Sequence, residues 1–163
     1  MLIVVLTMML LFVAAGGAAL LMTGILGGYQ KNRELSTQAM YAAEAGLHKA
    51  TYQLMASSGL ATINTTSIAA QTFASGYEPT LAAIFETTVT PGAAWEGRIY
   101  TRGSAGNGRV VKFMRAYVRV QSVGYGGTLY LYDWQEIPRS VVVAHRDSLD
   151  DANPKKAEFT NWL

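Results

Sequence analysis

The first 29 residues limit what this chain can fold into more than any other stretch. They read MLIVVLTMMLLFVAAGGAALLMTGILGGY and contain no charged side chain. A helix that spans a bilayer needs about 20 apolar residues, each rising about 1.5 Å. Positions 1–29 are therefore predicted to be a transmembrane or filament-core helix, and the other residues have to supply the folded part.

A secretory signal peptide is the alternative interpretation of this apolar segment. Such a peptide begins with basic residues and has an apolar core of about 7–15 residues. Here the basic start is missing and the apolar run is longer, so a spanning helix is favoured. The segment also carries five glycines, each of which weakens a helix by up to about 1 kcal/mol relative to alanine. That composition suits a helix that repacks against other helices after it leaves the lipid.

The helix is expected to continue through positions 30–58, where no proline interrupts it. Apolar residues recur there at steps of three and four, which places them on one helix face. They are Leu35, Ala39, Ala43, Leu47, Ala50 and Leu54. We therefore predict one helix of about 55 residues whose amphipathic second half ends near Gly59. Its alanine-rich face permits a close approach to a sheet or to other helices.

The remaining sequence predicts an antiparallel sheet. Residues 59–80 are small and polar, and are expected to form a connecting loop with a short helical turn at 68–73. From residue 81 the apolar period becomes two, which indicates a β-sheet head over 81–163. Strands are expected at 84–89, 97–102, 110–121, 128–134 and 139–144, with a hairpin turn at 104–108 and a loop-like tail after residue 145. The predicted fold class is α+β: a long N-terminal helix with a protruding apolar half, and an antiparallel β-meander packed on its second half.

One segment of the helix carries a family resemblance. Residues 38–47 read QAMYAAEAGL, which is similar to the A-x-x-A-A-E-A-G-L segment of type IV pilins and pilin-like proteins of the PilX type. The helix-head motif consists of Ala43, Glu44, Gly46 and Leu47. The stretch from Ile99 to Val111 is also similar to the sheet hairpin of that group, although many β-meanders share such a pattern.

The resemblance implies a structural role and not an enzyme. Family members are inserted in the inner membrane, trimmed by a prepilin peptidase, and passed by the pilus assembly machinery into a helical, extracellular filament, the fimbrium. Such filaments serve cell adhesion and motility. Met1 would then be the processed end that carries N-terminal methylation. The tails pack in the filament core, and the residues expected there are Leu2, Val5, Leu10, Phe12 and Leu20.

Two features of the tail bear on this resemblance. Gly16, Gly17 and Gly24 correspond to the region that unwinds in assembled pili, although they also suit close helix packing in lipid. At position 5 most pilins carry a glutamate that neutralises the terminal amine of a neighbour, and here the residue is Val5. A buried unpaired ammonium is costly. Either another acceptor, such as a freed carbonyl, meets the amine, or the subunit occupies a minor or tip position.

Glu44 lies in an otherwise small and apolar stretch. We expect it to form a hydrogen bond from the helix to a loop or to a neighbouring subunit. The alternative is a solvated i,i+4 pair with His48, worth only a few tenths of a kcal/mol.

Six basic residues and no acidic one lie between Gly97 and Tyr132. The candidate surface or nucleic-acid contacts are Arg98, Arg102, Arg115, Tyr117 and Arg119. Basic and aromatic side chains on one strand face suit a phosphate backbone, so DNA is kept as an alternative partner. The competing interpretations are a solvated outer face, or pairing with acidic residues of the next subunit. Those acidic residues are Asp147, Asp150 and Asp151.

A stripe of Tyr130, Tyr132 and Trp134 is expected in the core beneath the helix, with a subunit contact as the alternative. Catalysis finds no support, since the two histidines, His48 and His145, have no metal-site spacing, and cysteine is absent. The aspartates at 147, 150 and 151 indicate a solvated loop more than a cation site. No cofactor is expected.

The predicted function is a structural subunit of a type IV pilus-like filament that polymerises as a homo-oligomer through its N-terminal helix. A minor or tip pseudopilin of a type II secretion-like system is the nearest alternative. A single-span membrane-anchored binding module is the alternative from another class.

Overall fold

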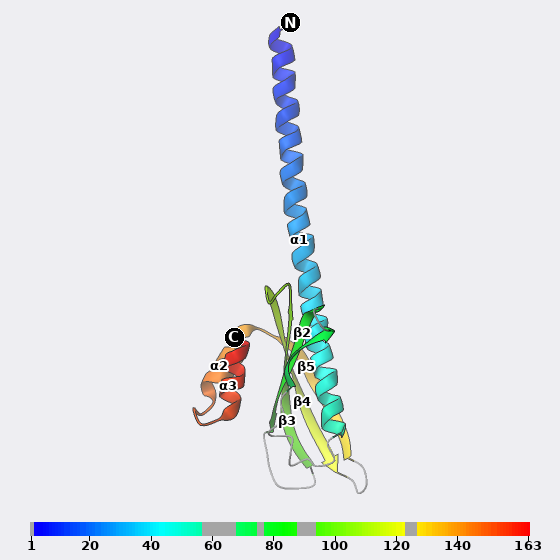
Figure 1. Cartoon of the computed structure of the whole chain (residues 1–163), viewed down its shortest axis with the longest axis vertical. Helices are drawn as coiled ribbons and strands as arrows, with labels where there is room; N and C mark the ends of the chain where they lie inside the picture. Colours follow the sequence, from blue (N-terminus) through cyan, green and yellow to red (C-terminus); the bar gives the residue numbers. More distant parts are fainter. Residues whose placement is uncertain (1, 57–67, 75–76, 88–93, 123–126) are drawn as a thin grey trace. The chain divides into compact units, whose positions relative to one another are not determined.

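The computed structural model describes the chain except for residues 1, 57–67, 75–76, 88–93 and 123–126. Within the described residues the chain forms one long helix, then five strands, then two short helices (Figure 1). These elements fall into two compact units, Met1–Leu35 and Ser36–Leu163.

Helix α1 (Leu2–Ala56) runs without a break for 55 residues, which confirms the single long helix predicted from the sequence. Its first part carries the apolar segment, and its second part, from Ser36 on, belongs to the second compact unit. The absence of proline and the alanine-rich face explain why the helix continues past the apolar segment.

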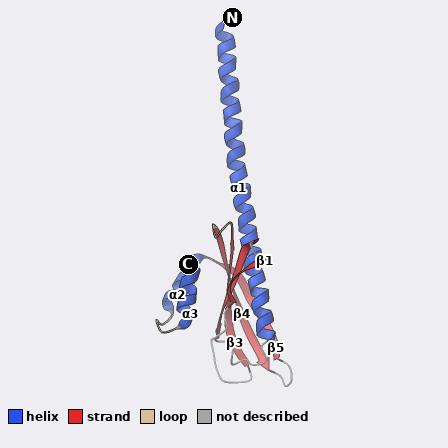
Figure 2. Ribbon diagram, viewed as in Figure 1, coloured by secondary structure: helices blue, strands red, loops and turns tan. Residues whose placement is uncertain are grey.

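The second unit contains a five-stranded antiparallel sheet in the order β1-β2-β3-β4-β5, a simple meander (Figure 2). Its strands are β1 (Ile68–Ala74), β2 (Tyr77–Thr87), β3 (Ala94–Ala105), β4 (Val110–Ser122) and β5 (Gly127–Ile137). The predicted hairpin turn is confirmed between β3 and β4, where Gly106, Asn107 and Gly108 all have positive φ. The expected helical turn at 68–73 is wrong, because these residues pair with β2 as an edge strand.

The second half of α1 packs on one face of the sheet, as predicted. Leu47, Ala50 and Leu54 are buried there against side chains of β2, β3 and β4. The closest approach is at Gly103 of β3, where an added Cβ would lie 2.0 Å from the carbonyl oxygen of Ala39. Since no side chain fits in that space, glycine allows the helix backbone to rest directly on the strand.

Two short helices cover part of the opposite face (Figure 2). They are α2 (Arg139–Ser148) and α3 (Pro154–Trp162). Val142 of α2 and Phe159 of α3 are fully buried against Tyr100 and Phe113 of the sheet, forming a second core. The predicted strand at 139–144 and the predicted loop-like tail are therefore both wrong, because burial of one helical face outweighs the β preference of the valine run at 141–143.

Strand β5 contains an irregularity that also corrects a prediction. The register shifts opposite Arg115 and Tyr117, and Asp133 adopts φ 50°, so one extra residue is accommodated in β5. Tyr132 and Trp134 are therefore out of phase with each other. Tyr130, Tyr132 and Trp134 are 52%, 44% and 55% exposed, so the expected core stripe is wrong.

Gly103→Ala is expected to destabilise the second unit by about 1–3 kcal/mol, since the methyl group forces α1 away from β3. The free energy of unfolding of the full chain in nonionic detergent, measured by urea titration of tryptophan fluorescence, checks this expectation.

Thr101→Val is the matched control on the same strand. Thr101 is fully buried, and its hydroxyl has no hydrogen-bond partner among the residues that the structure describes. Exchanging that hydroxyl for a methyl group is expected to leave the stability unchanged or to raise it. Equal losses in the two variants would contradict the close-approach explanation.

Candidate functional site

The first candidate site is the apolar surface of α1. Along Val4–Leu26 the large side chains are exposed, including Leu10, Phe12 and Leu20 at 66%, 76% and 75%. The helix is long and apolar enough to cross a membrane. Val5 is exposed as well, whereas Met1 lies outside the described residues. The chain thus presents a continuous apolar surface that only lipid or protein can cover.

The glycines predicted to unwind lie within a regular part of this helix. Gly16, Gly17 and Gly24 are helical, and an added Cβ at each would meet open space. Unwinding of these positions inside a filament stays a prediction, as does close packing in lipid.

The helix-head motif divides between two faces of α1. Ala43, Gly46 and Leu47 are buried toward the sheet, and an added Cβ on Gly46 would lie 3.3 Å from the carbonyl oxygen of Ala82. Glu44 is half-buried and forms no hydrogen bond or ion pair with any residue that the structure describes. The alternative pair with His48 is therefore absent, and the expected bond, to a loop outside the described residues or to a neighbouring subunit, stays a prediction.

A second exposed stripe on α1 was missed in the sequence. Tyr41, His48, Tyr52 and Met55 follow one another at steps of seven, four and three, so they share one helix face. All four are exposed, with Tyr52 at 72%. Their spacing was the signal, and it extends the apolar character of α1 into the second unit.

Three arginines of the sheet gather with tyrosines at one place, which we call the arginine–tyrosine face. It comprises Arg98, Arg115, Tyr117, Arg119, Tyr130 and Tyr132. The guanidinium carbons of Arg98 and Arg115 lie 5.5 and 5.1 Å from the centre of the Tyr117 ring. That ring stacks on Tyr132 with centroids 5.9 Å apart. A guanidinium group in such a position is attracted by the face of the aromatic ring. These attractions hold the cluster in a defined geometry.

Arg102 lies apart from this face, although the sequence analysis grouped it there. It lines a different cavity, of about 470 Å³, together with Trp162 and Leu163 at the end of α3. Tyr100 and the helices packed on it separate the two places. The structure therefore brings together four of the five predicted contacts and adds Tyr130 and Tyr132, which had been expected in the core.

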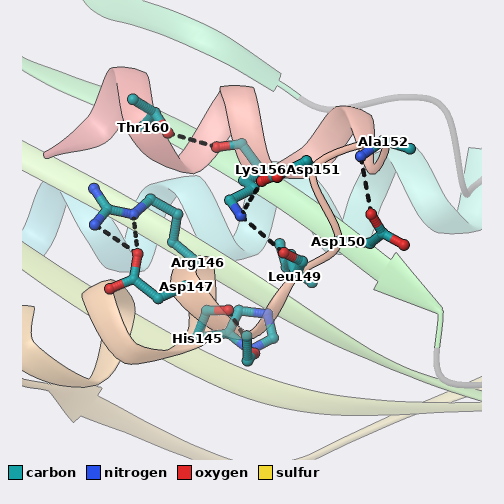
Figure 3. Close-up of polar contacts among 10 residues, drawn as sticks. His145, Arg146, Asp147, Leu149, Asp150, Asp151, Ala152, Lys156 and Thr160 are labelled. Carbon is teal, nitrogen blue, oxygen red and sulfur yellow. Dashed lines mark hydrogen bonds and ion pairs between the residues drawn. The ribbon is translucent and has the colours of Figure 1, made fainter.

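The acidic residues at the end of α2 and in the α2–α3 connection have partners within the chain (Figure 3). Asp147 pairs with Arg146 at 2.7 Å, and Asp151 pairs with Lys156 at 2.6 Å. Asp150 accepts a hydrogen bond from the backbone N–H of Ala152. The hydrogen bond from Lys156 lowers the pKa of Asp151 below its usual value. No group of three potential metal ligands occurs among the described residues.

A buried polar cluster joins α2 to the sheet and was also missed. The ring nitrogen Nε2 of His145 lies 2.7 Å from a carboxylate oxygen of Glu86, and both side chains are less than one fifth exposed. His145 also stacks on Tyr100, with centroids 4.9 Å apart. Burial, and after it the nearby Glu86 carboxylate, raise the pKa of Tyr100. The residues are 59 positions apart, so no local pattern reveals the contact.

Comparisons with protein-family models, with curated proteins and with solved structures found no match. The geometry of these surfaces is therefore the basis for a functional argument.

The pKa of Tyr100 gives a pH prediction. Because the folded state holds this proton more tightly than the unfolded state, its stabilising contribution is complete below about pH 10 and is lost as the pH rises through the raised pKa. The stability advantage of wild type over Tyr100→Phe should therefore shrink at alkaline pH. Urea unfolding of the wild type and of Tyr100→Phe at several pH values measures it, and an advantage that stays constant as the pH rises would contradict the raised pKa.

The contact between Glu86 and His145 can be tested by a double-mutant cycle. Glu86→Gln and His145→Ala, alone and combined, are expected to give a coupling of about 0.5–3 kcal/mol in the free energy of unfolding. Additive losses would contradict a direct interaction.

Proposed function

We propose that this protein is a structural subunit of a type IV pilus-like filament. The observation that carries the proposal is that α1 is one uninterrupted helix with two environments. Its first part exposes large apolar side chains, and its second part is built into a folded head through Gly103 and the alanine face. A surface of this kind needs a cover, which lipid supplies before assembly and neighbouring helices supply afterwards.

The arrangement favours contacts between unlike surfaces of successive copies. The apolar tail and the stripe of Tyr41, His48, Tyr52 and Met55 lie on the same helix but at different positions along it. Contacts of unlike surfaces that do not close a ring produce an open helical polymer. The glycines of the tail allow helix backbones to approach closely once several tails gather.

Val5 favours a second candidate, a minor or tip pseudopilin. In a repeating filament each terminal amine is buried beside a neighbour, and an acidic residue at position 5 would compensate its charge. Val5 provides no such compensation. A subunit at the tip has fewer neighbours, so the amine there stays closer to water.

A single-span membrane-anchored binding module is the candidate from another class. It uses the same helix as a permanent anchor, since the length and composition of α1 are compatible with membrane anchoring. The two classes differ in where the mature protein is found: a filament subunit leaves the membrane, and an anchored module stays in it.

The decisive experiment locates the protein in cells that produce it. Surface material is sheared off, separated from membranes, probed for the chain, and inspected by electron microscopy. We expect the chain in fibres that a deletion strain lacks, with abundant signal for a repeating subunit and only trace signal at fibre ends for a tip subunit. The mass of its N-terminal peptide should reveal the processed, methylated Met1.

Leu20→Lys is expected to abolish both membrane insertion and assembly, because a lysine near the middle of a spanning helix costs about 2.5–3.5 kcal/mol. Leu20→Met is the matched control and should assemble normally. Membrane fractionation and shearing measure the two steps. Retention of all wild-type protein in the membrane fraction, with every surface fibre intact in the deletion strain, would contradict the filament and support the anchored module.

A further inference from the structure

The arginine–tyrosine face has no role in the filament contacts proposed above, although its composition is unusual. Strands β3, β4 and β5 present it on the same side of the sheet as the second core, because Arg115 and Tyr117 alternate in phase with the buried Phe113. Helices α2 and α3 cover Phe113 and Tyr100, whereas Arg119, Tyr130 and Tyr132 are exposed. A hollow of about 340 Å³ lies on this face, lined by Arg98, Tyr117 and Tyr132 and also by Glu96 and Asp133.

Its positive charge is only partly compensated within the described chain. Arg119 faces Glu96 at 3.6 Å, and both side chains are more than half exposed, so this pair contributes little. No carboxylate among the described residues lies within ion-pair distance of Arg98 or Arg115. The Nε atoms of both are buried and have no hydrogen-bond partner within the described part of the chain. Arg98, Arg115 and Arg119 outnumber the carboxylates of Glu96 and Asp133 nearby, so the face carries a net positive charge.

We propose that the arginine–tyrosine face binds single-stranded nucleic acid. Tyr130 and Tyr132 are two residues apart on β5, so their rings are spaced by about 7 Å along the strand. Exposed rings on a sheet are platforms on which unpaired bases stack, and every base offers a π-face. Arg119 of the neighbouring strand β4 pairs in register with Tyr130. The guanidinium carbon of Arg115 lies 5.1 Å from the centre of the Tyr117 ring, which stacks on Tyr132. The guanidinium groups of these arginines can donate hydrogen bonds to the phosphates that accompany the stacked bases.

Two other occupants fit the face less well. A duplex hides its base faces, and this open sheet offers no helix or ribbon that enters a groove, so the rings would be unused. A second copy of the chain could offer a carboxylate such as that of Asp150, but carboxylates would leave the exposed rings of Tyr130 and Tyr132 unused. Unpaired bases with a phosphate backbone use both the rings and the guanidinium groups.

The test measures binding of the full chain in nonionic detergent to fluorescein-labelled oligothymidylate and oligouridylate of about 12 nucleotides, and to a duplex of the same length. Fluorescence anisotropy over a range of salt concentrations gives Kd and its salt dependence. We expect the single strands to bind at least about tenfold more tightly than the duplex. The two single-stranded probes decide whether DNA or RNA is preferred.

Charge variants separate this face from general attraction of a polyanion. Arg119→Ala should lower the slope of log K against log salt by about 0.7, the value for one phosphate contact on a single strand. Arg109→Ala removes the same charge from β4's preceding turn, away from the face, and should leave the slope unchanged.

Ring variants test stacking. Tyr130→Ala/Tyr132→Ala should weaken binding of both single strands at least about tenfold, since each stacked base contributes strongly. Tyr130→Phe/Tyr132→Phe keeps the rings and should retain binding. Tyr41→Ala/Tyr52→Ala, a matched pair of exposed tyrosines on α1, should have no effect.

Several outcomes would overturn the proposal. They are equal affinity for duplex and single strand, no loss in the tyrosine double-alanine variant, or equal slope changes for Arg119→Ala and Arg109→Ala. Circular dichroism confirms that each variant is folded, and the phenylalanine variant keeps the stacking test valid if the alanine variant unfolds. None of these outcomes depends on whether the protein forms filaments.

Discussion

The contact on which the head depends is the direct approach of the α1 backbone to strand β3 at Gly103. There the helix contributes Ala39, Ala42 and Ala43, and the strand contributes Gly103, which has no side chain. Close packing of this kind fixes the position of the helix more strictly than larger side chains would, because nothing in the interface can change rotamer. The amphipathic half of α1 is therefore part of the head, and the apolar half is left to other partners.

Two hydrophobic cores, one on each face, stabilise the sheet. The first lies under α1, and the second lies under α2 and α3, where the Glu86–His145 contact ties the C-terminal helices to the strands. What these layers leave uncovered is chemically distinct: an apolar helix surface and an arginine–tyrosine face. Neither contributes a core to the second unit, and both have the composition of surfaces that meet a partner.

Sequence reasoning predicted the long helix, the meander and the basic strand face because each depends on a local period. It failed where a tertiary contact decides. Val141, Val142 and Val143 favour a strand locally, but Val142 is buried on a helix. Asn153 and Pro154 did carry a helix-start signal, since the asparagine side chain caps the N–H of Lys155. Missing these helices also misplaced Arg102, which they separate from the arginine–tyrosine face.

The extra residue at Asp133 has a consequence for how one strand serves the whole head. Before it, Leu129 and Leu131 point toward the core beneath α1, and after it, Ile137 points toward the core beneath α2 and α3. A strictly alternating strand would keep all three on a single side. The irregularity thus changes the side of the sheet on which the later residues of β5 lie. Because of it, β5 contributes side chains to both hydrophobic cores. If β5 kept all its residues but lost this irregularity, every side chain from Trp134 on would change sides, and Ile137 would leave the core beneath α2 and α3.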